Sequence, residues 1–300
     1  MYSWKGKKVV VLGGDERELE IIRNLLLSGS IVQTYGVVPN EDYDSLQASN
    51  YLEAASGADI IIAPVPGVGE NDALYAPSSQ ESLVINPDFF KHVNRGAVYF
   101  SGTATDTIRK AGDAFDIQFF DLKDDDYLQV LHAIPTAEGA ISVTVQNTKE
   151  TIHNSNALVI GYGRIASLLA NNLKGMGAKV TVAARKPESR IRAYANGFQT
   201  LDVKQEELST HIHSFNLIYN TVPSLVLSPE VLQKVNPNTL VMDLASPPGG
   251  LNHRFGEELG LNVIWARGQA GTAPIHSGYA QFLSMVRILD NEYEYETSNR

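Results

Sequence analysis

Cysteine is absent from this chain of 300 residues. Without it the protein cannot form disulfide bonds, catalyse through a thiolate, or bind zinc or iron–sulfur clusters through cysteine. Long apolar runs are missing as well, and none approaches the roughly 20 residues that a membrane-spanning helix needs. The apolar run after Lys8 is also too short for the core of a signal peptide. We therefore expect a protein of the cytoplasm.

Basic residues are few: 24 lysines and arginines stand against 34 aspartates and glutamates, so the formal net charge is −10. This acidic balance, with no long basic stripe, argues against a nucleic acid or an anionic membrane as partner. No spacing of His, Asp and Glu resembles a metal site, and no Gly-x-Ser-x-Gly elbow marks a hydrolase. Small molecules and proteins remain as expected partners, and no metal is expected.

A glycine-rich turn carries the strongest functional signal. It follows the apolar run at residues 157–160 and reads Gly161-Tyr162-Gly163-Arg164-Ile165-Ala166. In dinucleotide-binding folds the first glycine makes the strand-to-helix turn, the second lets backbone N–H groups approach a pyrophosphate, and a small third residue lets helix and strand pack closely. Because apolar residues at helical spacing follow the turn, we expect a dinucleotide site here. The alternative is a tight turn without a ligand.

The residues after the next predicted strand select the dinucleotide. NAD sites usually carry an acidic residue there, which binds the ribose 2′-hydroxyl. Here Arg185 and Lys186 occupy that place, 185 − 161 = 24 residues after the first glycine, and Ser189 follows. Guanidinium and ammonium groups pair with a 2′-phosphate that a carboxylate would repel. The sequence predicts NADP as the cofactor, and the alternative is a basic turn exposed to solvent.

Strand and helix patterns alternate along the chain, which predicts an α/β fold with parallel sheets covered by helices. The first set of strands is expected at residues 9–12, 31–35, 59–62, 97–100 and 117–120. The second set is expected at residues 157–160, 179–184, 216–220, 239–244 and 261–265. The chain should therefore form two doubly wound, Rossmann-like parallel-sheet domains that are linked by helices, with a cleft between them.

Helical spacing of apolar residues between the two sets of strands predicts a linking helix at residues 135–152. It would separate an N-terminal substrate domain at residues 1–134 from a cofactor domain at residues 153–276. The last segment, residues 277–300, is expected to return to the first domain as a helix, with a frayed polar tail from Asn291.

Two loops at strand ends of the N-terminal domain are candidates for binding an acidic substrate. Asp15 and Arg17 follow the first strand at the start of a helix, where free N–H groups and a guanidinium suit a carboxylate. As the alternative, Asp15 only caps that helix. Ser101 and Thr103 follow another strand and open a helix, and either of them could be an N-cap instead.

Three successive strands of the cofactor domain end in small loops rich in proline or glycine, which suit a flat cofactor lying across the sheet edge. The residues expected to line the cofactor there are Asn220, Thr221, Val222, Pro223 and Asp243. Asp243 could equally be a buried cap. His132 and His276 lie nearest the expected hinges and are suited to proton transfer, but a lone histidine is more often structural.

Four segments carry a family resemblance. They are Val-Val-Val-Leu-Gly-Gly-Asp-Glu-Arg at 9–17, Pro-Thr-Ala-Glu-Gly-Ala at 135–140, Gly-Tyr-Gly-Arg-Ile-Ala at 161–166 and Asp-Leu-Ala-Ser-Pro-Pro-Gly-Gly at 243–250. In this order, along nearly the whole chain, they resemble the dipicolinate synthase A-subunit family of endospore-forming bacteria. The chain departs from that family at Ile275, where relatives carry a basic residue.

The resemblance implies an oxidoreductase that works in the mother cell during sporulation. Its substrate would be 4-hydroxy-tetrahydrodipicolinate from the lysine pathway, which loses water and two hydrogens to give dipicolinate. It also implies a flavoprotein-like partner, the dipicolinate synthase B-subunit, in a homo-oligomer or hetero-oligomer. Combined with the expected cleft, it makes Glu138, Arg17 and Thr136 the candidates for catalysis. The candidates for substrate binding are Asp15, Arg17, Ser101, Thr103, Thr136 and Glu138.

Glu138 has two interpretations. Facing a bound dicarboxylate, it could donate a proton to the departing 4-hydroxyl group. In the first turn of the linking helix, a carboxylate is also favoured for purely structural reasons by the helix dipole.

Two other functions stay open. The first is a dehydrogenase of the 2-hydroxyacid type, which needs a histidine with a carboxylate partner and an arginine in the cofactor domain. Arg267 and His276 supply only part of that set. The second is a non-catalytic subunit that binds NADP and senses its redox state or supports its partner.

Overall fold

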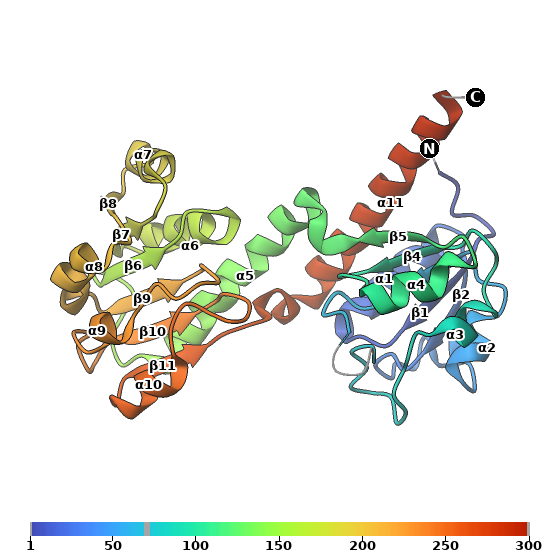
Figure 1. The fold of residues 1–300 in the computed structure, drawn as a ribbon, viewed down its shortest axis with the longest axis horizontal. Coiled ribbons are helices and arrows are strands. Elements are labelled where there is room, and N and C mark those ends of the chain that lie inside the picture. The colour runs from blue at the N-terminus through green and yellow to red at the C-terminus, as the bar shows by residue number, and fades with distance from the viewer. Residues whose placement is uncertain (1, 69–72, 299–300) are drawn as a thin grey trace. The chain divides into compact units, whose positions relative to one another are not determined.

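The computed structural model describes residues 2–68 and 73–298. The chain divides into two compact units: Met1–His132 with Ala273–Arg300 form the first, and Ala133–Thr272 form the second. Among the described residues, no helix has both the length and the apolar character that crossing a membrane requires. The two units are described separately, and their elements can be followed in Figure 1.

Within the described residues, the first unit contains one five-stranded parallel sheet with the strand order β2-β1-β3-β4-β5. The strands are β1 (Lys8–Leu12), β2 (Ile31–Tyr35), β3 (Ile60–Ile62), β4 (Val98–Ser101) and β5 (Gln118–Asp121). The order reverses between β1 and β3, as in doubly wound folds.

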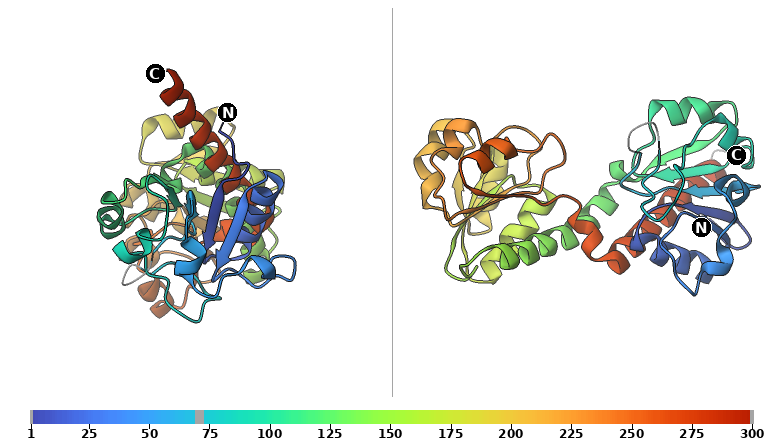
Figure 2. Two further views of the ribbon diagram at one scale, coloured as in Figure 1. Left: turned by 90° about the vertical axis from the view of Figure 1, so that its right-hand side faces the viewer. Right: turned by 90° about the horizontal axis from the view of Figure 1, so that it is seen from below.

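Helices cover both faces of this sheet, because alternate residues of its strands enter different cores. Val9 and Val11 of β1 pack with α1 and α11, whereas Val10 and Leu12 pack with α2, α3 and α4. These helices are α1 (Glu16–Leu27), α2 (Tyr51–Ala55), α3 (Pro87–Phe90), α4 (Asp106–Asp113) and α11 (Pro274–Ser298). In Figure 2 the red helix α11 runs alongside the blue elements at the start of the chain.

Within the described residues, the second unit contains one six-stranded parallel sheet with the order β11-β10-β9-β6-β7-β8, which is the Rossmann order. Its strands are β6 (Asn156–Ile160), β7 (Lys179–Ala183), β8 (Gln199–Leu201), β9 (Leu217–Asn220), β10 (Leu240–Asp243) and β11 (Asn262–Trp265). The order reverses between β6 and β9, so the glycine-rich turn leaves the sheet at the place where such folds bind nucleotides.

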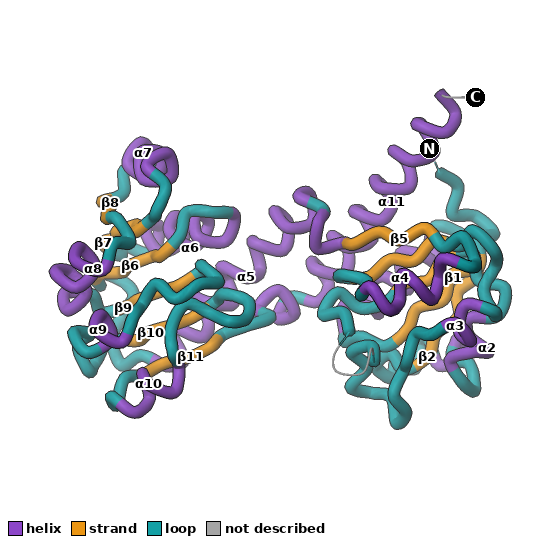
Figure 3. The backbone as a smooth tube through the Cα atoms, viewed as in Figure 1, coloured by secondary structure: helices purple, strands orange, loops and turns teal. Residues whose placement is uncertain are grey.

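The second sheet is also covered on both faces (Figure 3). Ala157 and Val159 of β6 pack with α5, α6 and α7, whereas Leu158 and Ile160 pack with α8, α9 and α10. These helices are α5 (Asp126–Asn147), α6 (Arg164–Gly175), α7 (Pro187–Ala195), α8 (Gln205–His211), α9 (Pro229–Leu232) and α10 (His253–Glu258). The expected fold class, two parallel-sheet α/β domains, is confirmed.

The linking helix differs from the prediction of residues 135–152. It is α5, which begins at Asp126, ends at Asn147 and contains Pro135 in its interior. A proline cannot donate to the carbonyl four residues before it, so the Leu131 carbonyl loses its helical donor. His276 Nε2 lies 3.3 Å from that oxygen and can replace the missing hydrogen bond.

Two further elements differ from the sequence-based expectation. The short edge strand β8 was not predicted, since its three residues show no periodicity long enough to detect. The tail from Asn291 was expected to be frayed, yet α11 continues to Ser298, and residues 299–300 lie outside the described part. Once Met285 and Leu289 anchor α11 in the core, each added residue gains a hydrogen bond at little further cost.

Two buried titratable side chains of the first unit, Glu18 and His132, have pKa values shifted in opposite directions. Burial raises the pKa of Glu18 to about 7, and its Oε2 accepts a hydrogen bond of 2.7 Å from the Asp15 N–H. Burial lowers the pKa of His132 to about 4, and its Nε2 lies 3.4 Å from the Ser277 carbonyl oxygen. At neutral pH His132 is therefore neutral, and its burial beside the Ser277 carbonyl favours a structural role.

We predict that these two shifts oppose each other in the pH dependence of stability. The Glu18 contribution to the free energy of unfolding falls as pH rises from 4.5 to about 7, because the folded state holds the proton longer. The His132 contribution rises between about pH 4 and 6.5, because the unfolded state holds the proton longer. Each effect amounts to about 3 kcal/mol over its window.

Urea unfolding between pH 4 and 7 tests this. Glu18→Gln should become more stable with rising pH relative to the wild type, and His132→Asn should become less stable. Parallel pH profiles for the wild type and both variants would contradict the burial argument.

Candidate cofactor site

The glycine-rich turn follows β6 directly and has no room for a side chain at its first position. Gly161 has φ +103°, which L side chains rarely adopt, and an added Cβ would overlap Thr221 Oγ1. Gly163 is the N-cap of α6, with no side-chain hydrogen bond to that helix end, and open space surrounds its Cβ position. The turn therefore leaves the N-terminus of α6 accessible to an anion, as a pyrophosphate site requires.

A pocket of about 200 Å³ adjoins the turn. One part of its wall is apolar and includes Val203, Val222 and Val226; the other part is basic and includes Arg185 and Lys186. The remaining lining residues are Gly161, Tyr162, Ala184, Ser189 and Ser224. An apolar slot beside cationic groups matches an adenine ring that carries a phosphorylated ribose.

The basic segment begins a helix of its own. Lys186 is the N-cap residue of α7 and Pro187 stands in the first turn, again with no side-chain hydrogen bond capping the helix. Arg185 and Lys186 are exposed, and Ser189 is half-buried. The turn thus presents two cations and a helix N-terminus together, each of which favours a bound phosphate.

Among the residues expected after β9, only Val222 lines the pocket. Asn220 is fully buried, and its Nδ2 donates to the Val222 carbonyl at 2.9 Å and to Asp243 Oδ1 at 2.8 Å. Thr221 Oγ1 donates to the Ile160 carbonyl at 2.9 Å, and Pro223 is exposed. The side chains of Asn220 and Thr221 are therefore committed to holding the loop.

Asp243 does not line the pocket, contrary to the expectation that it contacts the cofactor. Its carboxylate has no exposed surface and accepts hydrogen bonds from the N–H groups of Ala245 and Gly250, besides that from Asn220. His253 Nε2 lies 3.0 Å from Oδ2. Asp243 is thus the buried anchor around which the Ser-Pro-Pro-Gly-Gly loop folds.

Sequence reasoning missed His253. Its ring stacks on Trp265 with 4.2 Å between ring centroids, and the Arg267 guanidinium carbon lies 4.5 Å from the Trp265 ring centroid. The only signal in the sequence was the position of His253 in the loop-to-helix segment after Asp243, ten residues further along. Because β10 and β11 are adjacent, the fold brings the three side chains to one end of the sheet.

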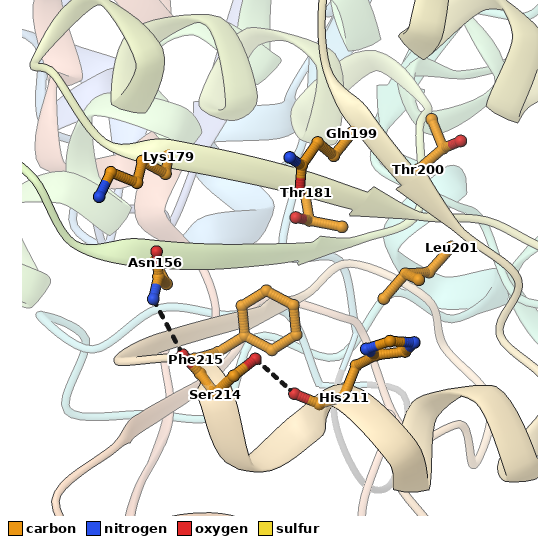
Figure 4. A pocket seen from close by; sticks show the side chains of 9 residues that line it. All are labelled: Asn156, Lys179, Thr181, Gln199, Thr200, Leu201, His211, Ser214 and Phe215. Atoms are coloured by element: carbon orange, nitrogen blue, oxygen red, sulfur yellow. Dashed lines mark hydrogen bonds between the residues drawn. The ribbon is translucent and has the colours of Figure 1, made fainter.

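A larger pocket of about 350 Å³ lies at the opposite, amino-terminal edge of the same sheet (Figure 4). It is lined by Asn156, Lys179, Thr181, Gln199, Thr200, Leu201, His211, Ser214 and Phe215. Asn156 Nδ2 donates to the Ser214 carbonyl at 3.2 Å, and the Ser214 hydroxyl donates to the His211 carbonyl at 2.7 Å. Since ligands of such sheets bind beyond the carboxyl ends of the strands, we do not assign the cofactor to it.

In the first unit, Asp15 forms the capping box that was its alternative interpretation. Its carboxylate also holds Arg17: Nε donates to Asp15 Oδ1 and Nη2 donates to Asp15 Oδ2, each at 2.7 Å. The N–H groups of Gly13 and Gly14 donate to the carbonyls of Tyr35 and Tyr75. These amides are therefore not free for a substrate, whereas Arg17 Nη1 has no hydrogen-bond acceptor among the described residues.

Ser101 ends β4 and Thr103 follows two residues later, but neither caps α4. Thr105 is the N-cap, and its hydroxyl accepts from the Ile108 N–H. Ser101 is 2% exposed, and its Oγ has no hydrogen-bond partner within the described residues. Thr103 is exposed, and its hydroxyl donates to the Gly102 carbonyl. A buried hydroxyl without a protein partner leaves a hydrogen bond for a bound water or a ligand group.

Thr136 and Glu138 belong to the second unit, unlike the other substrate candidates. Both lie well inside α5, because the helix begins at Asp126. The expected position of Glu138 in the first helical turn is therefore wrong, and the helix dipole gives no structural reason for a carboxylate there. Its side chain is exposed, and that of Thr136 is half-buried.

Comparison with protein families matches each unit separately. A model of the N-terminal domain of the dipicolinate synthase A-subunit matches residues 8–123. A model described as shikimate / quinate 5-dehydrogenase matches residues 143–249, which include the glycine-rich turn and the basic segment.

Whole-chain comparisons agree. The dipicolinate synthase A-subunit of Bacillus subtilis (strain 168) is 30% identical over 276 residues, which is 91% of this chain and 92% of that protein. The crystal structure of the dipicolinate synthase A-subunit from Bacillus halodurans matches with a TM-score of 0.87 and 28% identity, over 96% of this chain and 99% of that one. The corresponding Bacillus subtilis structure matches with a TM-score of 0.84 and 29% identity, over 96% and 97% of the two chains.

We predict that Asp243 is a stability residue. Asp243→Ala leaves the N–H groups of Ala245 and Gly250 buried without an acceptor, so the free energy of unfolding should fall by about 3 kcal/mol. Asp243→Asn keeps one acceptor oxygen and should lose less. The matched control is Glu258→Gln, which breaks an exposed ion pair with Arg254 on neighbouring α10 and should change stability by less than about 0.5 kcal/mol. Equal urea midpoints for Asp243→Ala and the control would refute the anchor.

Proposed function

Because the chain belongs to the dipicolinate synthase A-subunit family and is a dehydrogenase-type oxidoreductase, we propose that it uses NADP to convert 4-hydroxy-tetrahydrodipicolinate into dipicolinate. The observation that carries the proposal is the pocket beside the glycine-rich turn, where an apolar slot meets Arg185 and Lys186. Rossmann-type relatives imply a nicotinamide cofactor, and the basic wall is our reason for choosing NADP over NAD.

The residues of the second unit fit this cofactor. The missing Cβ of Gly161 and the open space at Gly163 allow a diphosphate to approach α6. Val222 and Val226 can flank the adenine, and Arg185, Lys186 and Ser189 can hold the 2′-phosphate. When bound, the nicotinamide supplies an acceptor for a hydride from a ring carbon of the substrate.

The chain's own residues would bind the dicarboxylate and manage its protons. Arg17 is held in a fixed position by Asp15 and keeps Nη1 for a carboxylate. Ser101 offers a buried hydroxyl that lacks a partner among the described residues. Ser101 ends β4, and Arg17 stands in the first turn of α1, which follows β1, so both lie near carboxyl ends of strands, where α/β sheets bind ligands.

Glu138 is our candidate for the acid that protonates the departing 4-hydroxyl group. A helix-dipole role no longer explains it, because it lies inside α5 and its side chain is exposed. Thr136 lies on the same helix two residues earlier and is the candidate for positioning the substrate. Loss of water then precedes removal of two hydrogens, which gives the aromatic ring of dipicolinate.

We further propose that the chain works with a flavoprotein-like second subunit, in the cytoplasm of the mother cell during sporulation. The support for a partner is the name of the relatives, which designates one subunit of an enzyme. The support for the location is the role that the family resemblance implies.

A 2-hydroxyacid dehydrogenase is the second candidate, and one observation favours it. His253 has a carboxylate partner in Asp243, at 3.0 Å, and Arg267 lies in the same cluster over Trp265. In the sequence analysis this set of histidine, carboxylate and arginine was incomplete, because His276 had no carboxylate partner. Oxidation of 2-hydroxy acids by the purified chain with NADP would favour this candidate.

The cofactor proposal predicts a strong preference of the wild type for NADPH over NADH. Arg185→Ala should weaken NADPH binding by about tenfold, because a charge-assisted contact to phosphate is lost, and change NADH binding by less than about threefold. Binding can be followed by the fluorescence of the reduced nicotinamide. The matched control, Arg254→Ala on α10, removes an exposed arginine outside the pocket. Equal affinities in the wild type that survive Arg185→Ala would defeat the proposal.

The reaction is tested by the absorbance of dipicolinate. We expect the purified chain, with NADP and 4-hydroxy-tetrahydrodipicolinate, to form dipicolinate either alone or after addition of the partner subunit. Glu138→Gln should lower kcat by at least about 100-fold, the usual contribution of a general acid, while cofactor affinity stays the same. If no dipicolinate forms under any condition, the chain is better explained as a non-catalytic subunit that binds NADP. Unchanged turnover of Glu138→Gln would discard its role as acid.

A further inference from the structure

Arg190 lies in α7, four residues after Lys186, and its guanidinium is turned toward the protein. Its Nη1 donates to the carbonyls of Ala184 and Arg185, at 2.6 and 2.9 Å. The same nitrogen lies 3.0 Å from Asp202 Oδ2. One cationic nitrogen therefore joins the end of β7, helix α7 and the loop after β8.

These contacts fix the backbone that carries the phosphate-binding side chains. Ala184 and Arg185 belong to the turn that lines the pocket, and Lys186 continues it as the N-cap of α7. Carbonyl oxygens at a turn lack the regular hydrogen-bond donors of a sheet or helix. A largely buried cation that donates to them therefore restricts the backbone of the turn to one conformation. The guanidinium is only about a quarter exposed, which strengthens the interaction.

Arg190 also pairs with Asp202, a negative charge close to the pocket. Its carboxylate is largely buried and precedes Val203, which lines the pocket. Asp202 Oδ1 accepts from the Lys204 N–H, and the Asp202 N–H donates to Glu207 Oε1, so the side chain is held in place. A fixed negative charge beside the pocket would repel a phosphate dianion unless a cation were paired with it.

We propose that Arg190 is a positioning residue that sets the cofactor preference of the pocket. It orients Arg185 and Lys186 through the two carbonyls and neutralises Asp202, so that the pocket accepts a 2′-phosphate. This inference rests on the proposed use of NADP and adds a residue that does not touch the cofactor. NADH, which lacks the 2′-phosphate, gains little from either effect.

The test compares NADPH and NADH affinities of the full chain by fluorescence and calorimetry. Arg190→Gln should weaken NADPH binding by about tenfold and NADH binding by less than about threefold, because only the phosphorylated cofactor meets the uncompensated carboxylate. Arg190→Lys keeps the charge and should retain part of the preference. Arg190→Gln combined with Asp202→Asn should recover most of the lost NADPH affinity. Arg192→Gln, an exposed arginine of the same helix outside the lining, should match the wild type.

Each outcome decides between the accounts. If Arg190→Gln weakens both cofactors by the same factor, or neither of them, Arg190 has no role in preference and the inference is overturned. The same holds if Asp202→Asn fails to restore NADPH binding in a variant that is folded by circular dichroism. Equal affinity of the wild type for NADPH and NADH would instead contradict the use of NADP itself.

Discussion

The close approach of the β6 and β9 loops is the constraint on which the second unit depends. Gly161 lies so near Thr221 that only hydrogen fits in place of a side chain, and Thr221 ties the two loops together through the Ile160 carbonyl. This contact occurs where the strand order reverses, and it opens the N-terminus of α6 toward the same edge of the sheet. The proposed anion site there rests on backbone geometry before any side chain contributes.

Side chains then divide into those that build the site and those that face a ligand. Asn220 and Asp243 look like ligand-binding residues in the sequence, but burial converts them into anchors, since a buried carboxylate must be satisfied by donors from the protein. Arg190 is converted in the same way by the carbonyls of the turn. Arg185 and Lys186 keep their charges exposed, so a cationic site survives in a protein with a formal net charge of −10.

The sequence was sufficient to predict the sheets and the glycine-rich turn. It was insufficient to predict which polar side chains form hydrogen bonds within the protein and which face the pocket. Apolar runs and glycines report local geometry, which is why all the predicted strands and the α6 turn are found close to their expected places. The predicted helix began at Pro135, because proline is favoured in the first turn of a helix and costly in its interior. Nothing local reveals that His276 lies beside the carbonyl that this proline leaves without its helical donor. The pairing of His253 with Asp243 likewise depends on tertiary packing between α10 and β10.

In the first unit, the proposed substrate site is harder to read from the sequence than the proposed cofactor site of the second unit. Its helix N-terminus at α1 is closed by the Asp15 and Glu18 capping box. The N–H groups of the preceding Gly13 and Gly14 donate to the carbonyls of Tyr35, at the end of β2, and of Tyr75. Glycines after a strand therefore leave the helix N-terminus open in the second unit and closed in the first. Because these amides already have acceptors, a substrate would have to be recognised by side chains. For the proposed carboxylate contact, Asp15 holds Arg17 in place, and Nη1 has no acceptor among the described residues. A guanidinium that is already ordered loses little entropy on binding a carboxylate, which supports the proposal of this arginine over a mobile surface cation.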